Sequence, residues 1–257
     1  IDLNGGAIAP IKGEGTEYGI RVEAAEGKVA FNAIAYTIDQ NNSPINVTQN
    51  VRDEINAMFG ANTVVPAGAN TVGDTSTLRS EGYEFELTVN PFPQWTFTAN
   101  YSYNDKAQTA IMPATVPYWE RARSENRPLL DYQNLNNLVA GTLGNADLVT
   151  PEFRTTWNFF TRYRIRDGAL AGVSLGLGAN YRDRAYLGAV NGASFYADSS
   201  LVWNSVIGYS GKWRGYDYTL NLNLNNVTDE QYYTAYALNF AGWSNPRELR
   251  LSATLKF

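Results

Sequence analysis

The residue pattern indicates an all-β protein, an antiparallel β-barrel that crosses a membrane with its strands. Segments with a period of two recur along the chain and put apolar side chains on one face and polar side chains on the other. Short turns between these segments alternate with long loops. Aromatic residues make up 13% of the chain and charged residues only 18%. A barrel with one face in lipid has this composition and this order of connections.

The amino-terminal part of the chain predicts two strands followed by a long loop. Residues 16–25 alternate between apolar and mostly charged positions, and a Glu-Gly pair follows as a turn signal. Residues 29–38 return as a second strand, although both of its faces are partly apolar. The stretch 39–77 is rich in Asn, Pro and Gly, so we expect it to be irregular apart from a short helix at 51–59.

The middle of the chain predicts a second hairpin, with strands at 78–89 and 94–104 joined by Asn-Pro-Phe-Pro. The strand 94–104 has the clearest pattern, because its odd positions from Trp95 onward are aromatic or Ala and its even positions are Thr, Asn or Ser. A second long loop is expected at 105–152. Within it, the charged segment 118–127 predicts a turn or two of helix.

The remaining strands follow the same rule. One face of 216–225 carries two Tyr and three Leu, and the other face carries Asp, Thr and Asn. We expect Phe97, Tyr101, Leu220, Leu222, Leu251 and Leu255 to face lipid. Loops are expected at 183–197 and 227–245. Five strands are expected, at 155–166, 170–182, 198–209, 216–226 and 247–257.

The connections predict how the nine strands are oriented. Membrane barrels have short periplasmic turns and long extracellular loops, which places the carboxyl end on the periplasmic side and the amino end outside. Complete barrels of this type have an even number of strands. We therefore expect the nine strands to be part of a larger barrel, in which the strands at 16–25 and 247–257 pair with backbone outside this set.

The composition excludes several kinds of site. The chain has no His and no Cys, so Ser-His-Asp and Cys-His nucleophilic sites and thiolate or imidazole metal ligands are absent. The acidic residues in the loops do not have the spacing of a calcium-binding loop. The net charge of −5 argues against nucleic-acid binding. We expect no enzymatic activity, no metal site and no cofactor.

Three segments resemble hairpins of one family. The turn LNLNNVTDEQYY followed by the strand PRELRLSATLKF, which ends on Phe257, resembles the closing hairpin of the TonB-dependent outer-membrane receptors. The segments EGYEFELTVNPFPQWTFTANYSYND and TEYGIRVEAAEGKVAFNAIAYTID resemble other hairpins of these barrels. The family barrel has about 22 strands around a plugged lumen. The resemblance implies that residues 1–257 are the carboxy-terminal part of such a barrel, without its plug domain and earlier strands.

The resemblance also implies a function and partners. The expected function is active uptake of a scarce large solute, most often an iron–siderophore complex, through the outer membrane of a Gram-negative-type cell. The implied partners are a TonB-type energy-transducing complex, which contacts the missing amino-terminal part, the barrel-assembly machinery and outer-membrane lipid. Phe257 would belong to the signal by which the assembly machinery recognises barrel strands for membrane insertion.

Aromatic and Arg clusters in the long loops are the candidate ligand-binding residues. Extracellular loops bind the solute in the family, and flat rings with guanidinium groups suit anionic or catecholate ligands. Each ring could instead only pack the loops together. The candidates are Tyr118, Trp119, Arg121, Arg123, Arg184, Tyr186, Tyr232, Tyr233, Tyr236 and Trp243.

Two other functions remain open at this point. A passive porin or other small barrel would be complete in one chain and would have an even number of strands. A soluble all-β carbohydrate-binding protein would place the same aromatic side chains in a sandwich core.

Overall fold

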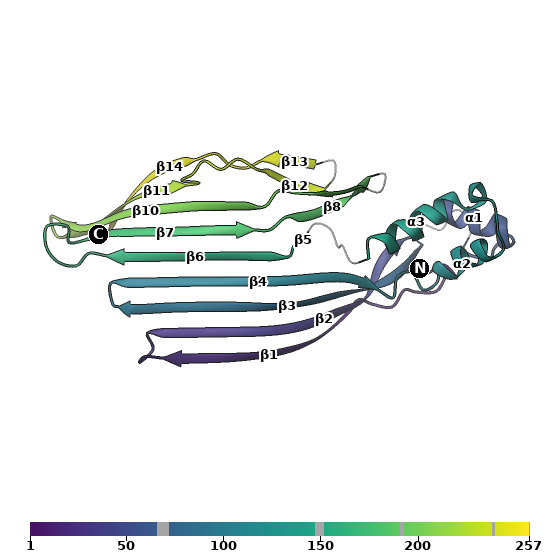
Figure 1. Ribbon diagram of the computed structural model, residues 1–257, viewed down its shortest axis with the longest axis horizontal. Coiled ribbons are helices and arrows are strands. Elements are labelled where there is room, and N and C mark those ends of the chain that lie inside the picture. The colour runs from purple at the N-terminus through teal and green to yellow at the C-terminus, as the bar shows by residue number, and fades with distance from the viewer. Residues whose placement is uncertain (66–71, 147–151, 191–192, 238–239, 257) are drawn as a thin grey trace. The chain divides into compact units, whose positions relative to one another are not determined.

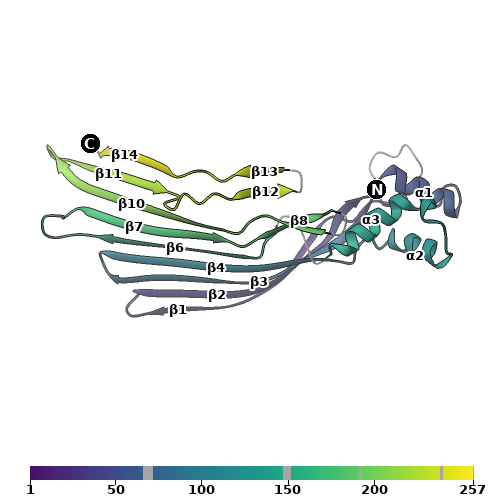
Figure 2. The same cartoon turned by 45° about the horizontal axis from the view of Figure 1, so that its top comes forward.

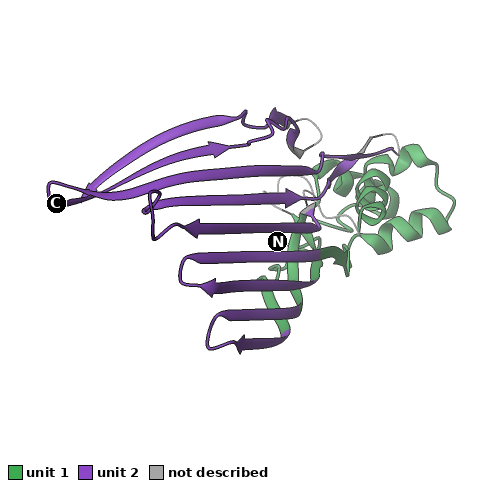
Figure 3. Ribbon diagram, turned by 60° about the vertical axis from the view of Figure 1, so that its left-hand side comes forward, with its two compact units in different colours: residues 1–16, 36–81, 105–149 green, residues 17–35, 82–104, 150–257 purple. Residues whose placement is uncertain are grey.

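The computed structural model describes residues 1–65, 72–146, 152–190, 193–237 and 240–256. The chain divides into two compact units, which Figure 3 colours separately. Each unit draws on several parts of the sequence. Unit 1 comprises Ile1–Thr16, Tyr36–Glu81 and Asp105–Val149, and unit 2 comprises Glu17–Ala35, Gly82–Asn104 and Thr150–Phe257.

Nine strands form one sheet (Figure 1). Their order across this sheet is the same as their order along the chain. This confirms the predicted number of long strands. The strands are β1 (Lys12–Ala24), β2 (Val29–Asn46), β3 (Gly73–Phe92), β4 (Trp95–Thr109), β6 (Thr155–Arg164), β7 (Val173–Arg182), β10 (Ser200–Trp213), β11 (Tyr216–Asn225) and β14 (Glu248–Lys256).

The strands β2 and β3 are longer than expected. They continue to Asn46 and begin at Gly73, so the prediction of an irregular stretch at 39–77 is wrong at both of its ends. The polar side chains here do not prevent pairing, because the hydrogen bonds of a sheet join backbone groups. The hydroxyl of Thr77 on β3 also donates a hydrogen bond of 2.9 Å to the side-chain oxygen of Asn41 on β2.

The two ends of the strand order are β1 and β14. Within the described part of the chain, no pairing joins these two strands. A small closed barrel would require that pairing, so the nine strands do not form a small closed barrel by themselves.

The register places the expected lipid-facing side chains on one face of the sheet. Leu222 on β11 lies opposite Leu251 on β14 and opposite Ile207 on β10. Tyr101 on β4 lies opposite Trp157 on β6. Directly opposed residues project to the same side, so the apolar face continues from strand to strand.

Glycine is required at one position of the opposite, polar face. A Cβ atom at Gly176 on β7 would lie 2.6 Å from Cγ1 of Val206 and 3.0 Å from Cζ of Phe160. The ring of Phe160 therefore occupies the space above β7 that a side chain would need. A glycine within a strand commonly marks such a close approach.

The two ends of the sheet differ in unit 2. Its short turns lie together at one end, and two smaller sheets lie at the other end, as Figures 1 and 2 show. The prediction of irregular loops at 183–197 and 227–245 is wrong in part, since both stretches contain strands. Their Tyr, Phe and Val residues favour extended backbone. The smaller sheets comprise β5 (Glu152–Phe153), β8 (Ala185–Val190) and β9 (Ala193–Tyr196), and β12 (Tyr233–Ala237) with β13 (Phe240–Trp243).

Unit 1 contains three α-helices, α1 (Gln49–Phe59), α2 (Val116–Ser124) and α3 (Gln133–Gly144), and the 3₁₀ turn η1 (Leu129–Asp131). The first two confirm the predicted helices, whereas α3 lies in a stretch that was predicted to be a loop. None of the described helices has the length and apolarity of a membrane-crossing helix. The helices share a buried core of Leu3, Val47, Val51, Ile55, Met58, Val64, Val72, Met112, Ala122, Tyr132, Leu135 and Val139.

Candidate ligand-binding site

The candidate residues fall into groups in both units. Tyr118, Trp119, Arg121 and Arg123 belong to α2 in unit 1. The other six candidates belong to unit 2, and Phe257 lies outside the described residues. The six are Arg184 before β8, Tyr186 in β8, Tyr232 before β12, Tyr233 and Tyr236 in β12 and Trp243 in β13.

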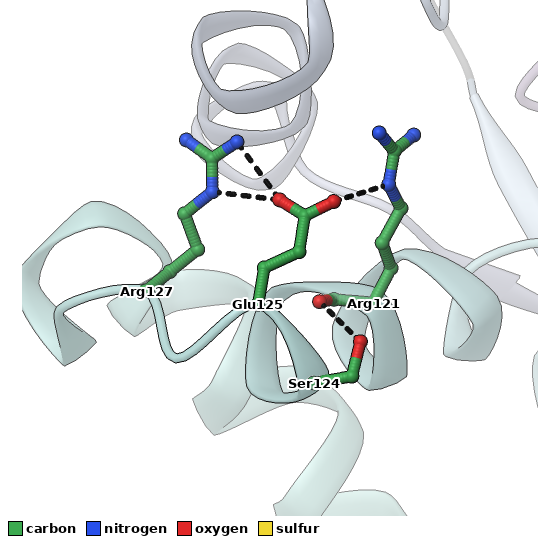
Figure 4. A network of polar contacts seen from close by, with 4 residues as sticks. All are labelled: Arg121, Ser124, Glu125 and Arg127. Atoms are coloured by element: carbon green, nitrogen blue, oxygen red, sulfur yellow. Dashed lines mark hydrogen bonds and ion pairs between the residues drawn. The ribbon is translucent and has the colours of Figure 1, made fainter.

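In unit 1, two guanidinium groups lie over one aromatic ring. Cζ of Arg121 lies 4.4 Å from the ring centroid of Phe59, and Cζ of Arg127 lies 5.5 Å from it. Glu125 lies between them in Figure 4 and accepts hydrogen bonds from Nε of Arg121 at 2.8 Å and from Nε of Arg127 at 3.0 Å. These hydrogen bonds from Arg121 and Arg127 hold the pKa of the Glu125 carboxyl below its usual value.

The remaining α2 candidates are partly engaged in packing. Nε1 of Trp119 donates a hydrogen bond of 3.0 Å to Oδ1 of Asn136 on α3, and the guanidinium of Arg123 lies 4.4 Å from a Trp119 ring centroid. The ring of Tyr118 lies 5.9 Å from that of Phe59. Trp119 therefore also joins α2 to α3, and Tyr118 joins α2 to α1.

Asp74 positions α2. This residue is 4% exposed. Its Oδ2 accepts hydrogen bonds from the backbone N–H of Ala114 at 3.0 Å, the backbone N–H of Thr115 at 2.7 Å and the hydroxyl of Thr115 at 2.8 Å. A carboxylate at a helix amino terminus satisfies unpaired N–H groups and interacts favourably with the helix dipole. The Arg-bearing helix is thereby fixed to β3.

In unit 2, the candidates Arg184 and Tyr186 meet at Tyr196 of β9. The guanidinium of Arg184 lies 5.0 Å from the ring centroid of Tyr196, and the rings of Tyr186 and Tyr196 meet edge to face at 5.6 Å. Tyr186 is buried, whereas Tyr196 is exposed. The accessible ring of this group is therefore Tyr196, which the sequence analysis did not select.

A cavity of about 500 Å³ lies beside the β12–β13 hairpin of unit 2. It brings together the candidates Tyr232 and Trp243 with amide side chains, and the ring of Tyr233 stacks on Trp243 at 4.2 Å. Figure 2 shows this hairpin at the end of the sheet that is opposite the short turns. The cavity is lined by Val202, Asn204, Asn225, Asn226, Tyr232, Thr234, Trp243, Ser244, Asn245, Pro246 and Glu248.

Asn226 holds the backbone around this cavity. It is 4% exposed and has a φ of 51°, the left-handed region that Asn tolerates better than most residues. Its Oδ1 accepts a hydrogen bond from the backbone N–H of Glu230 at 2.8 Å, and its Nδ2 donates to the carbonyl oxygens of Glu230 and Asn245 at 3.0 Å each. The polar turn NNVTDEQ thus joins the end of β11 to the segments before β12 and β14.

Several residues of these groups were not found by sequence analysis. Phe59 contacts Arg121 from a distant part of the sequence, and Tyr196 contacts Arg184 and Tyr186 from the next strand, so local patterns gave no signal for them. Arg127 lies in the charged segment 118–127 but was not selected as a candidate. The cavity amides Asn225 and Asn226 were assigned to the end of a strand, and Asn245 was assigned to a loop. Within the described part of the chain, no cluster of three or more Asp or Glu side chains is placed to hold a metal ion.

Comparison with protein families gives one match over most of the chain. The family model described as TonB dependent receptor-like, beta-barrel, matches residues 2–227. Among individual proteins, the chain is 24% identical over 197 residues to a probable TonB-dependent siderophore receptor, PiuA, of Acinetobacter baumannii. The alignment covers 76% of this chain and 23% of PiuA.

Solved structures share the fold. The pyoverdine outer-membrane receptor FpvA of Pseudomonas aeruginosa bound to pyoverdine matches 99% of this chain with a TM-score of 0.68 and 16% identity. The ferric preacinetobactin receptor BauA of A. baumannii matches 96% of this chain with a TM-score of 0.66 and 18% identity. The chain covers 31% of FpvA and 30% of BauA, so it spans less than a third of each relative.

Proposed function

The chain belongs to the TonB-dependent receptor-like β-barrel family of the outer membrane, and from this premise we propose that it takes part in the uptake of a ferric siderophore. Membership of this family excludes the soluble carbohydrate-binding alternative. In the proposal, residues 1–257 form the carboxy-terminal part of the receptor barrel, with the long connections outside the cell and the short turns in the periplasm.

The cavity beside β12–β13 is the observation that carries this proposal. It lies at the end of the sheet with the long connections, and it combines aromatic rings with amide and carboxylate groups. Siderophore complexes present flat or chelated oxygen-rich groups, which rings can stack on and amides can hydrogen-bond. The related proteins PiuA, FpvA and BauA carry names that refer to siderophores or to a ferric siderophore complex.

The guanidinium groups of Arg121 and Arg127 beside Phe59 favour binding of an anionic ligand. Arg121 and Arg127 share one carboxylate, Glu125, so the group of three keeps a net positive charge. Guanidinium groups pair well with planar anionic oxygens. We propose a role for this pair in attracting the ligand to unit 1.

Coupling to a TonB-type energy-transducing complex is part of the proposal as a family property, and we assign no residue of this chain to it. Folding by the barrel-assembly machinery, with Phe257 in its recognition signal, is proposed on the same basis. A passive porin stays the rival function. A passive porin needs no energy source, so uptake that stops when the proton gradient is dissipated would exclude the porin function.

The experiment compares two Trp variants of the natural full-length protein. Trp243→Ala removes a ring from the cavity, and Trp213→Ala removes a ring beside a short turn. Binding of ferripyoverdine and ferric preacinetobactin is measured by fluorescence, and uptake by growth under iron limitation. We expect Trp243→Ala to weaken binding of one probe about tenfold, the loss typical of a central aromatic contact, and Trp213→Ala to leave it unchanged. Equal effects of both variants, or binding of neither probe by the unaltered protein, would count against the proposal.

A further inference from the structure

The apolar face of unit 2 contains a groove of about 550 Å³ around Ala99 of β4. Large rings surround this small side chain. Phe97 and Tyr101 are its neighbours on the same face of β4, and Phe159 of β6 lies directly opposite it. The groove exists because the methyl group of Ala99 leaves a space that a larger side chain at this position would occupy.

Contacts between aromatic rings fix the positions of the side chains that line the groove. The rings of Phe97 and Phe159 stack at 6.1 Å, and those of Phe85 and Tyr101 meet at the same centroid distance of 6.1 Å. Asn100 also borders the groove, but the alternation along β4 directs its side chain to the polar face of the sheet. The groove therefore presents apolar surface to an occupant.

Family membership identifies what covers this face. The apolar outer band of an outer-membrane barrel faces lipid, and the groove continues the same band. Its volume lies within the range of about 300 to 1,000 Å³ that is common for sites of small molecules. An acyl chain in the groove would contact rings on several sides, whereas on a flat part of the face it would contact them on one side only.

The position along the strand identifies the leaflet. Ala99 follows Trp95, the first residue of β4 after a short turn, by four positions. At about 3.3 Å per residue this is roughly 13 Å along the strand, and the depth is smaller because barrel strands are tilted. The apolar band of such barrels is about 25 Å tall, so the groove lies in the half nearer the short, periplasmic turns.

We propose that the groove around Ala99 binds one acyl chain of a phospholipid of the periplasmic leaflet. The protein thus has a lipid site on its outer wall, separate from the cavity beside β12–β13. Trp157 lines the groove and reports its occupation, because bromine atoms on an acyl chain quench the fluorescence of a Trp side chain that they contact.

The test uses the natural full-length protein in detergent, titrated with phosphatidylethanolamine that carries brominated acyl chains. The signal of Trp157 is the difference between each protein and the same protein with Trp157→Phe. Ala99→Phe fills the groove. The matched control is Ala253→Phe, which adds a ring to the same apolar face on β14, opposite Leu220 and outside the groove.

We expect saturable quenching of Trp157 at about one lipid per protein in the unaltered protein. Ala99→Phe should raise the lipid concentration at half-saturation roughly tenfold, the change expected when the apolar contacts of about one side chain are lost. Ala253→Phe should leave this concentration unchanged. Quenching that rises without saturation, or that responds equally to both variants, overturns the proposal. So does self-association of the unaltered protein that Ala99→Phe abolishes, because a second copy would then be the occupant.

A failure of Ala99→Phe to fold leaves the proposal testable. The heat-modifiable mobility of the variant reports folding, and Ala99→Leu is the smaller replacement, for which we expect a weaker shift in the same direction. The unaltered protein also tests the proposal without any variant. If its quenching does not saturate, the groove is not a lipid site.

Discussion

The carboxylate of Glu54, on α1, accepts a hydrogen bond of 2.8 Å from the backbone N–H of Leu135 in the first turn of α3. It also accepts a hydrogen bond of 3.0 Å from the backbone N–H of Asn134. The residue before α3, Tyr132, makes no side-chain capping bond to the helix. A residue about eighty positions away in the sequence therefore supplies the cap that α3 lacks.

Removal of this cap should loosen α3. In Glu54→Ala, two N–H groups lose their acceptor, and we expect local destabilisation of about 1 to 2 kcal/mol, in the range of other helix caps. Hydrogen exchange of the α3 amides in the full-length protein measures this. Asp53→Ala is the control, since Asp53 is exposed on the same helix. Faster exchange in both variants to the same extent would show that the cap is not the cause.

Substitution of Asp74 should release α2. Asp74→Ala leaves the buried N–H and hydroxyl of Thr115 without this acceptor, which costs about 1 to 3 kcal/mol. We expect α2 amides to exchange faster and the Arg pair on Phe59 to lose its fixed position. Asp74→Asn keeps one acceptor oxygen and should show a smaller effect. An Asn variant that is as destabilised as the Ala variant would indicate that the charge, and not the hydrogen bonds, matters.

The Glu125 interactions should depend on pH. Because Arg121 and Arg127 lower the pKa of Glu125 in the folded state, their stabilising effect is fully present above the unfolded-state pKa of about 4.3. It is lost as pH falls through the lower, folded-state pKa. We expect the difference in α2 exchange between the unaltered protein and Glu125→Gln to shrink at acidic pH. A difference that is constant down to pH 3 or so would contradict this assignment.

A charge on the apolar face should impair assembly. Leu251 lies on that face and is 73% exposed, so Leu251→Arg places a charge in lipid at a cost of about 2 to 4 kcal/mol near the bilayer centre. The adjacent Ser252 faces the polar side, opposite Asn221, and Ser252→Arg should be tolerated. The amount of heat-modifiable protein in the outer membrane gives the comparison. If the two variants assemble equally well, the two faces have been assigned the wrong way round.

The strands of this protein could be predicted because their information is local. In β4 and β11 the alternation of side chains fixes both the strand and its two faces, since successive residues of extended backbone point to opposite sides. The order of the strands followed from the short turns, which force neighbours in the sequence to pair. The same reasoning indicated α1 and α2, whose boundaries moved by no more than three residues.

The loops could not be predicted in the same way, because tertiary contacts decide their structure. The strands β12 and β13 stack Tyr233 on Trp243, and α3 begins where Glu54 offers a carboxylate. The sequence identified the types of residue that bind a ligand, aromatic rings and guanidinium groups. Which of them share a cavity was decided by the tertiary structure, because hydrogen bonds such as those of Asn226 bring together segments that no short-range pattern connects.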